Sequence, residues 1–185
     1  MDASHRKTRR TFNEPGHAHH LTFSCYQRLP LLVRDRTRLW VIEAIRTVRT
    51  RHNVSLLAYV IMPEHVHLLV WPRQKGYRVE RLLYDLKRPV SIKARRFLED
   101  NDGGDLLSRL TVVRGRTRTF RFWQAGGGFD RNLVDRRSLR CVAEYIHGNP
   151  VRRGLVTSPQ DWPWSSAAFW NGRTDVPLDM DSMDV

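Results

Sequence analysis

Residues 54–71 read VSLLAYVIMPEHVHLLVW, two apolar stretches separated by Pro63 and Glu64. Each stretch is rich in β-branched and apolar residues, which favour strands, and a proline-containing dipeptide between two such stretches is typical of a tight turn. The sequence therefore predicts two strands, 54–62 and 65–71, joined as an antiparallel hairpin.

Helical and strand patterns surround this hairpin. Apolar residues recur at helical spacing in three segments, and two further segments alternate as strands do. The second helical segment contains Pro89, so we expect a kink or break near Lys87 and Arg88. The expected helices cover 35–51, 79–99 and 135–147, and the further strands cover 20–26 and 119–124. Strands interspersed with helices predict an α+β fold, an antiparallel β-sheet with helices packed on it.

A chain of 185 residues is long enough for one domain with its own core. We expect a single catalytic domain at 18–173, preceded by a flexible basic arm at 1–17 and followed by an acidic, disordered tail at 174–185. No apolar run approaches the ~20 residues needed to cross a bilayer, so no membrane association is expected. Two cysteines are too few for a disulfide scaffold, and we expect a soluble, cytoplasmic protein.

The net charge of the chain is +13, from 32 basic and 19 acidic residues. The acidic tail holds four aspartates and no basic residue, so residues 1–173 carry +17. Of the basic residues 28 are arginine, whose planar guanidinium suits phosphate recognition. This excess indicates a polyanion as partner, with nucleic acid as the first candidate. Colloidal solubility or a coding bias toward arginine are the alternatives.

The hairpin also carries a candidate metal site. Successive side chains of a strand point to opposite faces, so His65 and His67 share one face while Val66 occupies the other. Two imidazoles at that spacing can share a metal ion, the alternative being a polar pair on a half-exposed strand. His17 and His19 have the same spacing, but they lie beside the flexible start and are not expected to be ligands.

A second informative segment, 144–155, reads EYIHGNPVRRGL. On a helix Tyr145 and Asn149 would lie one turn apart on the same face. Tyr145 would then offer a nucleophilic oxygen and Asn149 an amide oxygen for a metal ion. A tyrosine near a helix end also serves packing or hydrogen bonding, and the segment alone does not choose between these roles.

Four segments together resemble the REP-associated tyrosine transposases, which are single-tyrosine HUH transposases of bacterial insertion sequences. They are MPEHVHLLV, FWQAGGGFDRN, YIHGNPVRRGLV and DWPWSS, and the resemblance covers roughly residues 18 to 168. The resemblance implies an HUH transposase-like, ferredoxin-like sandwich with Tyr145 as nucleophile. It also implies His65, His67 and Asn149 as ligands of a catalytic Mg²⁺ or Mn²⁺. Glu64 stands where the family commonly has Asn, which makes it a possible neighbour of the metal site.

The resemblance implies a metal-dependent endonuclease and transesterase that cleaves and rejoins single-stranded DNA near REP-like hairpins. The intermediate would be a 5′-phosphotyrosine, and the protein would be bacterial, cytoplasmic and nucleoid-associated. A monomer is favoured, with a dimer as the alternative. Two other functions stay open: a domesticated DNA- or RNA-binding module that does not cleave, and an HUH initiator nuclease of replication or conjugation.

Recognition of DNA would depend on other residues. Arginines near the expected strand 119–124 and around the tyrosine helix are expected to hold phosphates rather than read bases. Two aromatic residues, Trp123 and Phe129, are candidate stacking surfaces for unpaired bases. The arginines are Arg114, Arg116, Arg118, Arg121, Arg136, Arg137, Arg140, Arg152 and Arg153. Trp162 and Trp164 are expected to cap the core, with a helix starting at Ser166.

Overall fold

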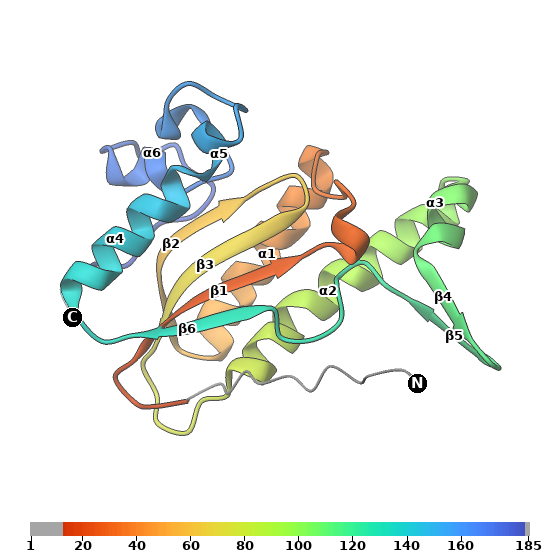
Figure 1. The fold of residues 1–185 in the computed structure, drawn as a ribbon, viewed down its shortest axis with the longest axis horizontal. Coiled ribbons are helices and arrows are strands. Elements are labelled where there is room, and N and C mark those ends of the chain that lie inside the picture. The colour runs from red at the N-terminus through yellow and green to blue at the C-terminus, as the bar shows by residue number, and fades with distance from the viewer. Residues whose placement is uncertain (1–12, 184–185) are drawn as a thin grey trace, which may run out of the picture.

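The computed structural model describes residues 13–183, with a four-stranded antiparallel sheet at its centre (Figure 1). The strands lie in the order β2-β3-β1-β6 across the sheet. Their bounds are Ala18–Ser24 (β1), Val54–Ile61 (β2), His65–Pro72 (β3) and Phe129–Leu133 (β6). β2 and β3 form the expected hairpin, and β1 pairs antiparallel with both β3 and β6. The α+β fold predicted from the sequence is confirmed.

Helices cover both faces of this sheet. α1 (Asp35–Arg51) and α2 (Val79–Asp100) pack on one face, and α4 (Arg136–His147) packs on the other (Figure 1). The Asp135 carboxylate caps α4 by accepting a hydrogen bond from the Ser138 amide. The short elements are Tyr26–Arg28 (η1), Gly104–Arg109 (α3), Asn149–Arg152 (α5), Pro159–Asp161 (η2) and Ala167–Trp170 (α6).

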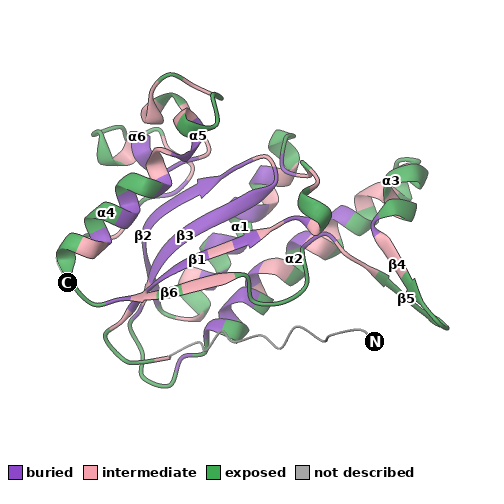
Figure 2. Ribbon diagram, in the orientation of Figure 1, coloured by how far each residue is buried: buried purple, intermediate pink, exposed green. Residues whose placement is uncertain are grey.

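The alternation of β3 divides its side chains between two apolar cores. Val66 and Leu68 belong to the core beneath α1 and α2, whereas Leu69 belongs to the core beneath α4. His65 and His67 lie on the same face as Leu69, as the alternation predicts. β2 and β3 are buried almost throughout (Figure 2), so this face is covered except where a cavity opens beside α4.

A separate two-stranded ribbon follows α3 and consists of β4 (Thr111–Arg114) and β5 (Thr117–Phe120). The single strand expected at 119–124 is therefore wrong. The chain leaves the ribbon after Phe120 because Phe122 and Trp123 are buried in the core. Trp123 then forms an isolated bridge with Cys25, just beyond the end of β1.

α2 is one continuous helix, so the break expected near Lys87 and Arg88 does not occur. Pro89 lies on the exposed side of the helix. The opposite side of α2 supplies Leu82, Leu86 and other apolar residues to the core, and this packing holds the two halves of the helix in line.

The outer edge of β2 is covered by the segment that contains Trp162 and Trp164. The Ile61 amide donates to the Trp164 carbonyl over 2.8 Å, and the Ser166 amide donates to the Tyr59 carbonyl over 3.0 Å. Trp162 donates from its ring nitrogen to the Ile61 carbonyl. Both tryptophans pack against the cores and α6 begins directly after Ser166, as the sequence predicts.

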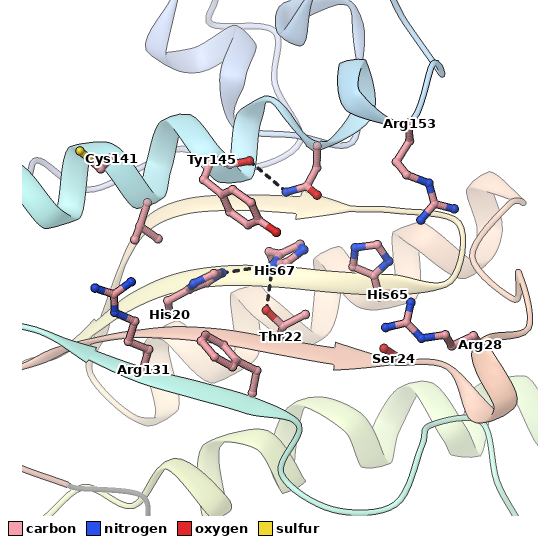
Figure 3. Close-up of a pocket in the computed structure, with 13 residues that line it drawn as sticks. His20, Thr22, Ser24, Arg28, His65, His67, Arg131, Cys141, Tyr145 and Arg153 are labelled. Atoms are coloured by element: carbon pink, nitrogen blue, oxygen red, sulfur yellow. Dashed lines mark hydrogen bonds between the residues drawn. The ribbon is translucent and has the colours of Figure 1, made fainter. Parts of the chain in front are cut away.

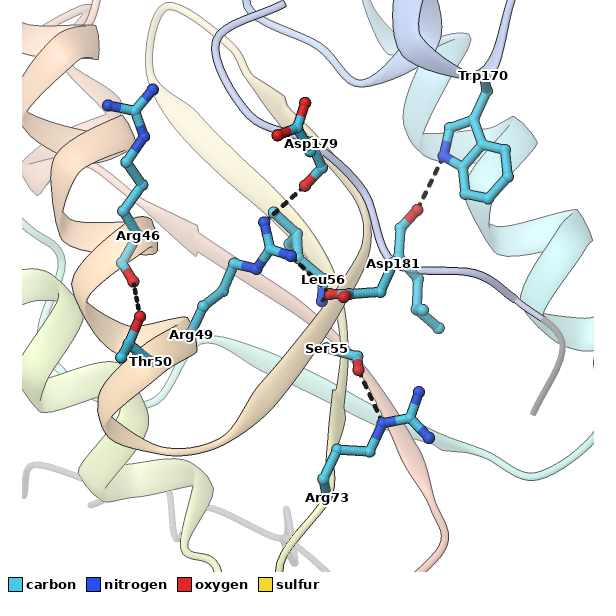
Figure 4. A network of polar contacts seen from close by, with 10 residues as sticks. Arg46, Arg49, Thr50, Ser55, Leu56, Arg73, Trp170, Asp179 and Asp181 are labelled. Atoms are coloured by element: carbon cyan, nitrogen blue, oxygen red, sulfur yellow. Dashed lines mark hydrogen bonds and ion pairs between the residues drawn. The ribbon is translucent and has the colours of Figure 1, made fainter.

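The acidic tail continues along the same edge (Figure 4). The Asp181 amide donates to the Leu56 carbonyl, and its carboxylate accepts from the Leu56 amide and from Arg49. Leu178 and Met180 are buried in the core. The expected disorder of this tail is therefore wrong up to residue 183, because two apolar side chains and the arginines of α1 give it an anchoring surface.

The expected N-terminal arm is described only from Asn13 onward, and residues 1–12 lie outside the described part of the chain. The Asn13 side chain accepts a hydrogen bond from the Val79 amide at the start of α2. The Glu14 carbonyl accepts one from the Tyr77 hydroxyl. The boundary expected between 17 and 18 thus falls inside a segment that is bonded to the domain.

Candidate active site

A cavity of about 650 Å³ opens between the sheet and α4 (Figure 3). His65, His67, Tyr145 and Asn149, the four residues singled out from two distant segments of sequence, all line it. The sheet brings β3 under α4, and the chain turn after α4 returns Asn149 to the same cavity. Every proposed ligand and the proposed nucleophile therefore meet at one place.

Both histidines are buried and are held from behind through Nδ1. His65 Nδ1 lies 3.2 Å from the Glu64 carboxylate, which can only accept, so the imidazole donates. His67 Nδ1 lies 2.8 Å from Thr22 Oγ1 and 3.1 Å from His20 Nε2. These contacts leave Nε2 of each ring as the nitrogen available to a ligand in the cavity.

Burial also sets the protonation state of these rings. Desolvation, followed by the proximity of His65 and His20, lowers the pKa of His67 to about 3. Desolvation lowers the pKa of His65, although the Glu64 carboxylate opposes that change. Desolvation and the neighbouring Arg131 lower the pKa of His20 to about 4. The imidazoles are therefore neutral at neutral pH, which is the form that binds metal ions.

Tyr145 is 48% exposed and faces the histidines across the cavity. Its ring centroid lies 5.8 Å from that of His67 and 6.0 Å from that of His20. The Arg152 guanidinium carbon lies 4.4 Å from the centroid of the tyrosine ring, a cation–π contact. The hydroxyl of Tyr145 is thus presented to the cavity by a ring that has neighbours on several sides.

Asn149 is buried, and its amide nitrogen is occupied. It donates to the Tyr145 carbonyl over 3.0 Å and to the Ile146 carbonyl over 3.4 Å. Because the nitrogen is used in this way, the side-chain oxygen remains to face a ligand. The sequence placed Tyr145 and Asn149 on one helix; α4 ends at His147 and Asn149 begins α5, yet the i to i+4 contact is kept.

Glu64 lies behind His65 rather than along the cavity wall. Its Oε1 atom accepts a hydrogen bond from Arg153 Nη1 over 2.9 Å and from His65 Nδ1. The carboxylate is buried; the Arg153 guanidinium offsets its charge, and the neutral His65 imidazole contributes a hydrogen bond. Glu64 is therefore connected to the candidate metal site by its contact with His65.

The donor set fits a divalent cation. Among residues 13–183 no group of three or more His, Cys, Asp or Glu side chains is placed to hold a metal ion. The two histidines have the Asn149 side chain beside them in the cavity, and its amide oxygen is the donor left over once the nitrogen is bonded. Two neutral imidazoles with one amide oxygen leave coordination positions open for substrate oxygen atoms.

Sequence reasoning missed several residues that line the cavity. His20, Thr22 and Ser24 come from alternate positions of β1, and alternation would have grouped them had the register with β3 been known. Arg131 on β6 and Arg28 in η1 lie toward opposite ends of the cavity (Figure 3). No local sequence signal pointed to either arginine, because only the folded sheet brings them here.

The arginines expected to bind phosphate fall into separate groups. Arg153 lines the cavity and Arg152 contacts the ring of Tyr145. The exposed arginines of α4 are Arg136, Arg137 and Arg140, and those of the ribbon are Arg114, Arg116 and Arg118, with Arg121 at its base. The arginines therefore form one group at the cavity, one on α4 and one on the β4–β5 ribbon. Their role in DNA binding stays a prediction.

The two aromatic candidates differ in exposure. Trp123 is 6% exposed, packs edge-on against Phe23 and donates from its ring nitrogen to the Lys87 carbonyl. The prediction that Trp123 offers a stacking surface is wrong, because the ring belongs to the core. Phe129 lines the cavity beside His20, so its role in stacking stays a prediction.

An antiparallel sheet that sets a His-x-His pair opposite a helix-borne tyrosine defines the HUH transposase class that the sequence resembles. Residues 15–149 match the family model described as "Transposase IS200 like", and the chain belongs to that family. Its members are transposases, enzymes that cleave and transfer DNA.

Two relatives extend this comparison. The chain is 25% identical over 170 residues to a Haemophilus influenzae protein described as a REP-associated tyrosine transposase, covering 80% of this chain and 88% of the relative. A solved structure of a REP-associated tyrosine transposase bound to a REP hairpin superimposes with a TM-score of 0.69 at 19% identity. That alignment covers 95% of this chain and 92% of the other, and it shows the same fold. Among residues 13–183 no helix has the length and apolarity that a membrane span requires.

Proposed function

We propose that this chain cleaves and rejoins single-stranded DNA beside a REP-like hairpin, with Tyr145 as the nucleophile. The observation that carries the proposal is the convergence of Tyr145, His65, His67 and Asn149 on one cavity. Membership of the transposase family supports the reaction type, and the two REP-associated relatives support the hairpin as the substrate class.

In the proposed reaction the Tyr145 oxygen attacks the scissile phosphorus. A bond forms between phosphorus and the tyrosine oxygen while the bond to the 3′ oxygen breaks. The tyrosine hydroxyl gives up its proton as it attacks, and the departing 3′ oxygen takes up a proton. The 5′ phosphate therefore stays on the protein, and the other fragment ends in a 3′-hydroxyl. One phosphodiester replaces another, so rejoining needs no external energy source.

His65, His67 and Asn149 would hold Mg²⁺ or Mn²⁺. When bound, such an ion neutralises phosphate charge and orients the scissile group for in-line displacement. The protein itself fixes both imidazoles from behind and presents the exposed tyrosine to the same cavity. These arrangements reduce the reorganisation that the reaction requires.

The strand to be cut would cross the cavity between its basic ends. Arg131 lies toward one end, and Arg28 and Arg153 lie toward the other (Figure 3). Phosphates on either side of the scissile group could therefore meet guanidinium groups, which bind phosphate oxygens through paired donors. Phe129 would offer its ring to a base in the same cavity.

The test is incubation of the protein with end-labelled hairpin DNA that carries single-stranded flanks, with Mg²⁺ or Mn²⁺, followed by a denaturing gel. We expect a covalent protein–DNA adduct together with a shortened strand. Binding without cleavage across a panel of hairpins and both metals would overturn the proposal in favour of a DNA-binding module. Cleavage that is indifferent to a neighbouring hairpin would favour an initiator nuclease.

A further inference from the structure

The β4–β5 ribbon extends away from the body of the molecule, beyond α3 and at the opposite end from α4 (Figure 1). Arg114 pairs with Thr117 across a two-residue turn in which Gly115 has a φ of +57°. The ribbon is attached at its base, where the Arg121 amide donates to the Leu110 carbonyl over 2.7 Å. Residues 113–119 are exposed on both faces of the ribbon (Figure 2).

The charge of this ribbon is entirely positive. Residues 109–121 contain five arginines and no acidic residue. None of these arginines forms an ion pair with any residue between 13 and 183. They are Arg109, Arg114, Arg116, Arg118 and Arg121. Their charge is therefore not neutralised by any residue between 13 and 183 and remains available to an anion.

Arginines on the helical face of the molecule behave differently. Arg49 pairs with Asp181 at 2.8 Å, Arg81 with Asp85 at 3.2 Å and Arg95 with Glu99 at 2.8 Å. Pairing within the chain reduces the field that those residues present to a polyanion. In the ribbon, by contrast, all five arginines are unpaired among residues 13–183.

The shape of the ribbon favours duplex DNA over a single strand. The major groove of B-form DNA is about 12 Å wide and admits a two-stranded β-ribbon. Proteins that bind single strands use exposed aromatic rings for stacking, and the exposed residues 113–119 include none. The deep, narrow major groove of A-form RNA does not admit side chains in this way.

We propose that the β4–β5 ribbon binds the groove of a DNA duplex, with Arg114, Arg116 and Arg118 contacting its phosphates. The inference rests on the proposed function in one respect, namely that the strand beside this duplex enters the cavity near Tyr145. The protein then has two DNA-binding surfaces with different ligands. The cavity receives unpaired nucleotides, and the ribbon grips the paired stem.

The test compares the ribbon variant R114Q/R116Q/R118Q with the control variant K75Q/R78Q/R88Q. Each variant removes three exposed positive charges that form no ion pair with a residue between 13 and 183, and the control changes residues in and just before α2 instead of the ribbon. Two fluorescent DNAs of equal length serve as probes: a hairpin with a stem of about 12 base pairs and an unstructured single strand. Anisotropy titrations over about 100 to 300 mM NaCl give the affinity and its salt dependence for each.

We expect the ribbon variant to lose about tenfold or more in affinity for the hairpin, with its salt slope reduced by about 2 to 3. Its affinity for the single strand should change less than about twofold. The control should weaken both DNAs slightly and to the same extent. Equal losses on both probes in the ribbon variant, or an unchanged affinity for the hairpin, would overturn the proposal.

The binding assay is carried out in the Tyr145→Phe background, so its outcome does not depend on cleavage. If wild-type protein cleaves no hairpin, the proposed function fails while the stem preference of the ribbon can still be measured. If cleavage proceeds but the ribbon variant keeps full affinity for the hairpin, the inference about the ribbon fails alone. Circular dichroism of both variants confirms that the exposed substitutions leave the fold unchanged.

Discussion

Tyr145 and His67 meet edge to face, with 5.8 Å between their ring centroids and 86° between their planes. Tyr145 comes from α4 and His67 from β3, so the contact joins the helix on one face of the sheet to a strand beneath it. The exposed hydroxyl therefore belongs to a ring whose position is fixed by buried neighbours. A nucleophile held in this way requires little ordering when the substrate binds.

Replacement of Tyr145 by phenylalanine should abolish the covalent adduct and strand cleavage. The ring contacts with His67 and Arg152 are kept, so DNA affinity should stay within about twofold and the free energy of unfolding within about 0.5 kcal/mol. A denaturing gel measures the adduct and thermal unfolding measures stability. An adduct that persists in Tyr145→Phe would show that another residue is the nucleophile.

Replacement of Glu64 by glutamine should weaken metal binding by about 10- to 100-fold. The buried carboxylate accepts from His65 Nδ1 and so fixes the orientation and basicity of that ring. Isothermal titration with Mn²⁺, without DNA, measures the effect independently of activity. The control is Glu99→Gln, which removes an exposed carboxylate paired with Arg95 on α2. Equal Mn²⁺ affinities in wild type and Glu64→Gln would contradict the role assigned to Glu64.

Gly128→Ala should destabilise the fold by about 2 kcal/mol or more. Gly128 has a φ of +77°, and a Cβ atom there would lie 2.1 Å from the Thr22 carbonyl oxygen, at the entry to β6. Its neighbour Gly127 is the matched control, because a Cβ atom there meets nothing within 4 Å and no positive φ is required. Urea denaturation of both variants decides the matter. Similar losses of stability in the two variants would show that the close approach of Gly128 to β1 does not cause the destabilisation.

The two cysteines should differ sharply in reactivity. Cys25 is fully buried, and burial raises the pKa of its thiol to about 12, whereas Cys141 is exposed at the cavity wall. Iodoacetamide should therefore alkylate Cys141 alone in the native protein, and both after unfolding. Peptide mass spectrometry assigns the modified residue. Bound hairpin DNA should slow the modification of Cys141, and native alkylation of Cys25 would contradict its burial.

Lys87 should make stability depend on pH in the alkaline range. Burial lowers its pKa to about 8 from 10.5, while its amine contacts the Phe23 ring and the Gly126 carbonyl. Between these two values the unfolded chain binds more protons than the folded one, so stability rises with pH. This contribution is present above 10.5 and is lost as the pH falls through about 8. Urea titrations at about pH 7.5 and about pH 9.5 should show wild type gaining relative to Lys87→Met. A parallel pH profile in both proteins would refute the shift.

Local patterns in the sequence were sufficient for the β2–β3 hairpin and for the extents of α1, α2 and α4, although not for the continuity of α2 at Pro89. The continuous apolar stretches of 54–71 reflect burial on both faces of the sheet, whereas the helical periodicity of 35–51 reflects burial of one face of α1. The convergence of His65, His67, Tyr145 and Asn149 followed from family motifs, since no single segment specifies which elements meet in space. Local sequence patterns therefore predicted the strands and helices, whereas the family resemblance predicted which of their residues share one site.

Features that depend on register or on distant partners were not predictable. His20 and Thr22 contact His67 because β1 pairs with β3 in one particular register, which no local pattern sets. Tryptophan is a residue type that often stacks on bases. Trp123 lies in the core instead, where its backbone bridges to Cys25. The tail carries four aspartates and no basic residue, and only its contacts with α1 and β2 show how Leu178 anchors it.

The outer edge of β2 has its hydrogen-bonding groups taken up by two segments of the same chain, at Trp164–Ser166 and at Asp181. An open strand edge is a template on which a second molecule can add its own strand. Here a neighbouring copy would first have to displace residues that are already tethered at high local concentration. The C-terminal region thus acts as an intramolecular competitor, which protects the sheet from uncontrolled extension along this side.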